Sequence, residues 1–188
     1  MSDLTITNAG ISVAANSAGS SISTGKRKII RITPTLTAAS AYADGDVLFE
    51  FTEIENAVKE VGGCSKLTHC YLIDNDKDTF GVDLFFMEKN TNELGVRHAS
   101  AGISADNFRA NNLNGVLRHI QSVALSSDLD NVYVNKCMSL SDENESVEPI
   151  LLQASSDSTS VYVSGVLNSG TPTFATSKLI QLVLHIEY

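Results

Sequence analysis

Apolar and polar residues alternate along much of the chain from residue 28 onward, which is typical of half-buried β-strands. The clearest case is the last segment, whose two faces differ in polarity. One face carries Ile180, Leu182, Leu184, Ile186 and Tyr188, and the other carries Gln181, Val183, His185 and Glu187. The same pattern predicts nine strands, at residues 28–36, 46–54, 65–74, 79–89, 116–124, 132–140, 148–154, 160–167 and 178–188.

Strict alternation in the predicted strand 65–74 also sets which side chains share a face. One face carries Leu67, His69, Tyr71 and Ile73. Cys64 and Cys70 are an even number of residues apart, so on one continuous strand they share a face about 20 Å apart, too far for a disulfide. The chain has 3 cysteines, and an odd count without paired spacing argues against a disulfide framework. We expect free thiols in a protein made in a reducing cytoplasm.

One segment has a helical pattern. Ser104 is suited to cap a short helix that runs through Phe108 and Leu113, with Gly115 as its stop. Nine short strands and one short helix predict an all-β fold, an antiparallel two-sheet sandwich. A jelly-roll-like arrangement is favoured, because an immunoglobulin-like sandwich usually fits within about 100 residues.

The N-terminal segment differs from the rest. Residues 1–25 are mostly Ser, Thr, Ala, Gly and Asn, with a few widely spaced apolar residues. This composition fits either a disordered tail or an extended arm that gains order on a neighbouring subunit. We therefore divide the chain into an N-terminal arm, residues 1–27, and a β-sandwich domain, residues 28–188.

Charge narrows the function classes. With 13 Lys+Arg against 22 Asp+Glu, the formal net charge is -9, which argues against direct nucleic-acid binding. No apolar run is long enough to cross a membrane, and the first residues lack the pattern of a secretory signal.

The acidic turn at residues 74–79 is the most suggestive local feature. Asp74, Asp76 and Asp78 match the first three ligand positions of a calcium-binding EF-hand loop. The match then fails, since Thr79 stands where glycine is required and Phe85 where glutamate is required. We expect a solvated hairpin turn and keep these three carboxylates as weak metal candidates.

Catalytic signatures are missing from the sequence. It contains no nucleophile elbow and no phosphate-binding glycine loop, and its histidines (His69, His98, His119 and His185) lack the spacing of a zinc site. We expect no enzymatic activity, no catalytic residue and no cofactor. The strand histidines fit half-exposed or interface positions.

The basic block is Lys26, Arg27, Lys28 and Arg31, where the arm meets the sandwich. A charged edge strand discourages aggregation with other strands. The same charges would also steer docking onto an acidic patch of a partner, so these four residues are the candidate partner-binding site.

Several segments together resemble a group of small structural proteins of tailed bacteriophages. The resemblance covers roughly residues 28–188 and is carried by residues 32–58, 72–88 and 161–186 and by the ISADN at 103–107. Its most specific segments are AYADGDVLFE, within residues 32–58, and SGTPTF, within residues 161–186. It implies no active site. It implies a virion component of jelly-roll type, with capsid decoration (cement) proteins as the first choice.

A decoration protein binds the major capsid protein on the outer shell and touches no DNA and no membrane. The resemblance therefore implies a virion location after assembly in the host cytoplasm. Because most homo-oligomers close symmetrically, we also expect a small cyclic homo-oligomer, either a dimer or a trimer. Two alternatives stay open: a tail-associated or connector component, and a sugar-binding jelly roll that uses exposed aromatic residues such as Tyr42 and Tyr133.

Overall fold

The computed structural model describes residues 5–8, 11–14, 27–74, 78, 80–121, 132–136, 149–177 and 180–188. Within these ranges its elements, in chain order, are β1 (Thr5–Asn8), β2 (Ile11–Ala14), β3 (Arg27–Ile32), β4 (Val47–Ile54), β5 (Cys64–Asp74), β6 (Gly81–Met87), α1 (Ala105–Asn111), β7 (Leu113–Gln121), β8 (Val132–Lys136), β9 (Ile150–Gln153), β10 (Val161–Ser169) and β11 (Ile180–Glu187). Each of the nine predicted strands corresponds to one of β3–β11. The hairpin of β1 and β2 was not predicted.

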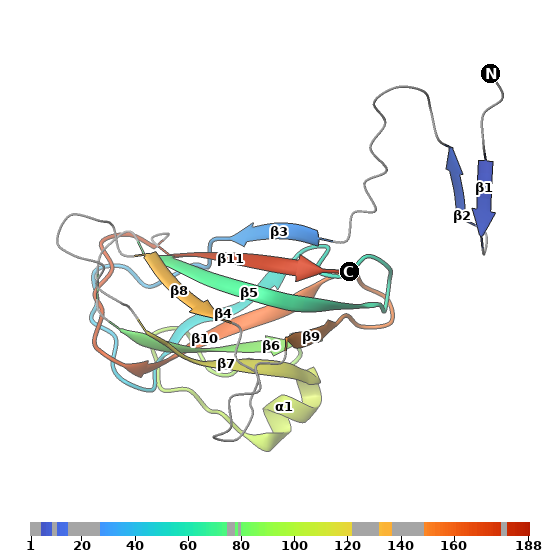
Figure 1. The fold of residues 1–188 in the computed structure, drawn as a ribbon. Helices are drawn as coiled ribbons and strands as arrows, with labels where there is room; N and C mark the ends of the chain where they lie inside the picture. Colours follow the sequence, from blue (N-terminus) through green and yellow to red (C-terminus); the bar gives the residue numbers. More distant parts are fainter. Residues whose placement is uncertain are drawn as a thin grey trace, which may run out of the picture.

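Two antiparallel sheets form the sandwich (Figure 1). One has the strand order β4-β10-β6-β7. The other has the order β3-β11-β5-β8, and β9 continues beyond β8 along the same side of β5. The strand pairing is nested. The first sandwich strand, β3, pairs with the last, β11, and inside this pair β4 pairs with β10, β5 with β8 and β9, and β6 with β7. This nesting is the connectivity of a jelly roll, so the predicted fold class is confirmed.

The core lies between the two sheets. The prediction for the last strand is confirmed, since Ile180, Leu182, Leu184 and Ile186 are buried while Gln181 and His185 are partly exposed. The largest side chains of the core come from the β4-β10-β6-β7 sheet, which supplies Phe49 and Phe86, and from the connections at one end, which supply Tyr42 and Phe174. The amphipathic strands therefore stabilise the fold through the burial that their alternation predicts.

β5 departs from strict alternation through a β-bulge at Thr68. Its pairing with β11 shifts register between Leu67 and His69. Leu67 is therefore buried in the core, and the prediction that it shares a face with His69 is wrong. The shared face predicted for Cys64 and Cys70 is wrong for the same reason, since Cys64 is exposed and Cys70 is buried. A bulge inserts one extra residue and reverses the in–out parity beyond it.

The predicted helix exists but ends earlier. Ser104 caps its N-terminus, accepting a hydrogen bond from the backbone N–H of Asn107, as predicted. Its C-cap is Asn112, in the left-handed conformation with φ 52°, and not Gly115. Gly115 lies in β7, where a Cβ atom would approach Ile150 Cγ2 to 2.8 Å. The glycine is required by close packing between the sheets rather than by helix termination.

The two most specific segments of the resemblance meet at one end of the sandwich. The connection before β4 donates backbone hydrogen bonds to the connection before β11, including Tyr42 N–H to the Pro172 carbonyl (3.0 Å) and Ala39 N–H to the Phe174 carbonyl (2.8 Å). Tyr42 is 1% exposed, so the idea of an exposed Tyr42 for sugar binding is wrong. Its hydroxyl accepts from Thr37 N–H (2.7 Å) and donates to the Leu48 carbonyl (3.1 Å).

The β4-β10-β6-β7 sheet is covered on its outer face as well. Residues 88–112, including α1, pack over it, and Figure 1 shows α1 on the side away from β11 and β5. The buried cluster there consists of Phe85, Met87, Leu94, Val116 and Val166. The edge of β4 is also occupied, because Val47 and the segment around Ala99 exchange backbone hydrogen bonds.

Replacing Tyr42 by Phe should lower the free energy of unfolding by about 1–3 kcal/mol, because it leaves a partly buried amide and a buried carbonyl without their partner. Urea unfolding measures this as a lower midpoint at an unchanged slope. The matched control is Tyr188→Phe, whose hydroxyl donates to the Asn56 carbonyl at an exposed position. An equal effect of the two substitutions would contradict the structural role of Tyr42.

Candidate docking face

The outer face of the β3-β11-β5 layer is the candidate site. Strand register places Ile29 opposite His185 and His185 opposite His69. The next row toward the middle of the sheet joins Arg31, Val183 and Tyr71. These outward side chains come from three strands that are distant in sequence and adjacent in space.

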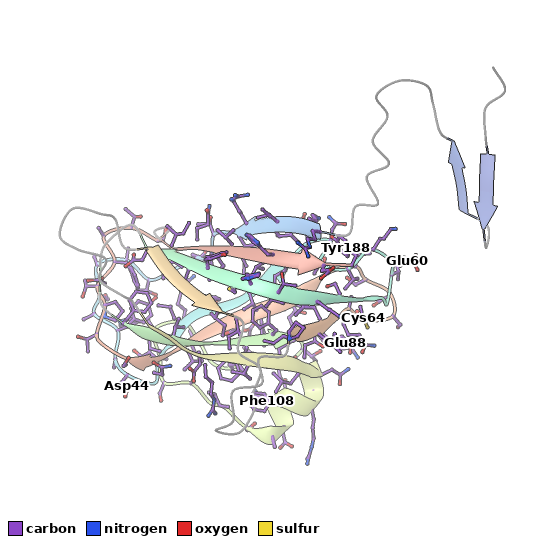
Figure 2. The ribbon with its side chains drawn as sticks, in the orientation of Figure 1. Asp44, Glu60, Cys64, Glu88, Phe108 and Tyr188 are labelled. Atoms are coloured by element: carbon purple, nitrogen blue, oxygen red, sulfur yellow. The ribbon has the colours of Figure 1, made fainter. Side chains whose placement is uncertain are left out.

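Within the part of the chain that the structure describes, no helix or loop packs over this face. Ile29 is 50% exposed, and Arg27, Arg31, Lys66 and His69 are exposed. Figure 2 shows the side chains of the sandwich, with Tyr188 and Cys64 at the end of this layer and Phe108 at the opposite, helix-covered side. The two sheets therefore differ, since one is covered on both faces and the other presents its outer face.

Three rings cluster in the middle of the face. The ring centroids of His69 and His185 are 5.7 Å apart, and those of Tyr71 and His185 are 5.2 Å apart, both in edge-on arrangements. The rings of His69 and Tyr71 are nearly parallel, with centroids 6.3 Å apart. The bulge produces this cluster, because without the extra residue at Thr68 the His69 ring would turn toward the core. Thr68 Oγ1 donates to the His185 carbonyl (3.0 Å), which ties the bulge to β11.

The candidate partner-binding residues that the structure describes lie on two different sides of β3. Arg27 and Arg31 alternate with Ile29 on the exposed side of β3, so both border the ring cluster. Lys28 is directed to the other side, where its Nζ donates to the Asn56 carbonyl (3.3 Å). Lys26 lies outside the described residues. The structure thus brings Arg27 and Arg31 together with two histidines, His69 and His185, that are far from them in the sequence.

A trough of about 430 Å³ runs over β11 between β3 and β5. Its floor is β11, and its walls are formed by β3 on one side and by the bulge of β5 on the other. The lining residues are Arg27, Lys28, Ile29, Thr68, His69, His185 and Ile186. This composition combines cationic, imidazole and apolar groups, which suits an anionic group carried on an apolar or backbone stem.

The electrostatics of the face favour a neutral His185. Burial lowers the pKa of His185 first, and the neighbouring His69 and Arg31 lower it further, because each of these disfavours the imidazolium. His185 is therefore uncharged at neutral pH and gains its proton only at lower pH than a free histidine. The fixed positive charge of the face comes from its arginines and Lys66.

Two of the three weak metal candidates in the acidic turn accept backbone hydrogen bonds. Asp74 is fully buried and accepts a hydrogen bond from Asp78 N–H (3.0 Å), and the Asp78 carboxylate accepts from Thr173 N–H (3.0 Å). Asp76 lies outside the described residues. Among the residues that are described, no group of three or more His, Cys, Asp or Glu side chains is arranged to hold a metal. The two described carboxylates therefore act as backbone acceptors.

The other histidines do not join the face. His98 has a positive φ of 62°, lies edge-on to Tyr42 at 4.8 Å, and its Nε2 is 2.9 Å from the Ala41 carbonyl oxygen. It packs at the end of the sandwich, on the covered edge of β4. Of His119 only the backbone, in β7, is described.

Comparison with known proteins adds no assignment. No family model, no curated protein and no solved structure matches the chain. None of the helices in the described part of the chain is long and apolar enough to cross a membrane.

We expect the stability of the protein to fall between about pH 7.5 and pH 5. His185 has a lower pKa folded than unfolded, so the unfolded chain binds protons first and stability is lost as the pH falls through the ordinary histidine range. His185→Gln should reduce this loss, as measured by urea midpoints at each pH. An unchanged pH dependence in the variant would contradict the lowered pKa.

Proposed function

We propose that the protein is a non-enzymatic virion structural protein, a capsid decoration protein that binds the outer coat lattice and stabilises the shell. The observation that carries this proposal is the asymmetry of the sandwich. One sheet is closed on both faces, whereas the outer face of β3, β11 and β5 presents arginines, histidines and Ile29 from a chain with net charge -9. A rigid body with one open basic face is suited to docking on an acidic surface.

The jelly-roll connectivity supports the same class. This topology is common in viral capsid proteins and also in lectins, so it limits the choice without deciding it. The two most specific segments of the resemblance to phage structural proteins, AYADGDVLFE and SGTPTF, pack against each other at one end of the sandwich. Neither of these two segments contributes a residue to the docking face.

The N-terminal arm joins the sandwich beside the docking face, which supports attachment of the protein to the coat through both. The chain enters the sandwich at Arg27, the first residue of β3, on the border of the docking face. An arm that leaves from this border adds contact area beside the face without a separate anchor. Each copy can then be held weakly, because many copies act together across a closed shell.

Charge reversal at the face tests the proposal. Arg27→Glu with Arg31→Glu should abolish most binding to coat particles stripped of the protein, with the largest loss at low ionic strength, because salt screens exposed charges. Cosedimentation with such particles measures the bound fraction. Unfolding in urea should stay close to that of the unmodified chain.

The matched control is Arg109→Glu with Lys89→Glu. These two residues lie on and beside α1, at the covered sheet, and the change in net charge is the same. Control and test variants that lose binding equally would show that net charge matters and the face does not. Undiminished binding of the Arg27/Arg31 variant at every salt concentration would leave these arginines with an edge-strand role only.

A further inference from the structure

The trough over β11 has the dimensions and the lining of a recognition pocket. Its volume of about 430 Å³ falls within the range of about 300–1,000 Å³ that is typical of ligand sites. It lies beside the ring cluster and opens onto the face proposed for docking. Ile29, which is 50% exposed, provides an apolar wall next to the cationic groups.

We propose that this trough binds an acidic peptide segment of the partner, and that protonation of His69 and His185 strengthens the binding. The inference rests on the proposed docking function and names the partner chemistry at that face. The segment needs carboxylate side chains spaced along an extended or loop backbone that can lie across β11.

The charged groups around the trough favour carboxylates. Arg27 and Arg31 on β3 present guanidinium groups, and a guanidinium can bind a carboxylate through two parallel hydrogen bonds. On β5, Lys66 lies opposite Glu187 of β11, and Glu187 also lies opposite Arg27. Glu187, the acidic residue of this row, therefore lies between Arg27 and Lys66 at one end of the face.

The histidine pair supplies the variable part of the charge. His69 and His185 are directly opposite in the register, and Lys136 of β8 holds the backbone position opposite His69. Two imidazolium groups at a ring separation of 5.7 Å repel each other and the nearby Arg31. A carboxylate between them removes this repulsion. Binding therefore favours protonation, and by linkage protonation favours binding.

Tyr71 and Thr68 complete the surroundings of the pair. Tyr71 lies edge-on to His185 and contributes an aromatic ring beside the pair. The Thr68 hydroxyl donates to the His185 carbonyl, which holds the backbone of the pair in place whether or not the rings are protonated. Protonation of the two histidine rings then changes the charge of the trough and leaves the fold unchanged.

The experiment uses the full chain and a fluorescent peptide of alternating Glu and Ala as the probe, with a Lys–Ala peptide as its matched control. Fluorescence anisotropy gives the affinity between about pH 8 and pH 5.5, where glutamates stay ionised. A rise of one pKa unit in one histidine on binding corresponds to a gain of about tenfold, so we expect the unmodified chain to bind about tenfold or more tightly at the lower pH.

One variant removes the histidine pair, and a second serves as a control for a charge change elsewhere on the protein. His69→Gln with His185→Gln should keep the weak binding at about pH 8 and lose the gain at low pH, whereas Arg109→Glu should change neither. An equal pH gain in the double-Gln variant would overturn the inference. Binding of a neutral oligosaccharide in place of the acidic peptide would overturn it as well, in favour of a sugar site.

The outcome is separable from that of the proposed function. If the protein binds coat particles through Arg27 and Arg31 but shows no preference for the acidic peptide and no histidine-dependent pH response, the inference is wrong and the docking function stands. If the peptide binds as expected but the protein does not bind coat particles, the trough recognises acidic segments of some other partner and the decoration function is wrong.

Discussion

The β-bulge at Thr68 determines what the protein presents to its surroundings. One extra residue in β5 keeps Leu67 in the core at one end of the strand and Cys70 and Leu72 in the core at the other. Because Thr68 is the extra residue, the side chain of His69 points outward and lies beside His185. A strand of strict alternation would place either an apolar row on the surface or an imidazole in the core, and both cost free energy. The bulge satisfies the core and creates the ring cluster with a single irregularity.

The second constraint is the unequal covering of the two sheets. Residues 88–112 cover the β4-β10-β6-β7 sheet, where Asn111 is fully buried and its side chain bonds the backbone of Asn92 in both directions. This anchors α1 and the preceding loop on that sheet. The β3-β11-β5 layer receives no comparable cover from the described residues. The contact surface of the protein follows from this asymmetry.

Sequence alone was sufficient for the fold class and for nearly all of the strand positions. The alternation of β11 is regular because both of its neighbours are sheet strands, so every inward residue meets the core. The cap at Ser104 was also predictable, since it depends on local hydrogen bonding. The end of the helix was not, because the stop at Asn112 depends on a left-handed residue and Gly115 has a packing role in β7.

The candidate site was predictable only in part. The basic block was found from charge. The strand alternation that places its Arg27 and Arg31 on the face also directs Lys28 to the other side, where it contacts the Asn56 carbonyl. The pairing of His69 with His185 could not be predicted. The two residues are far apart in the chain, and their register depends on a bulge that has no clear signature in residues 65–74. Strand pairing is a tertiary property, and propensity does not encode it.

The number of copies per purified virion is the most direct test of the central claim, measured by quantitative mass spectrometry against the major coat protein. A decoration protein that occupies a closed shell lattice predicts hundreds of copies. A count of roughly six to a few dozen would instead place the protein at the symmetry-limited tail or portal vertex, and it would contradict the account.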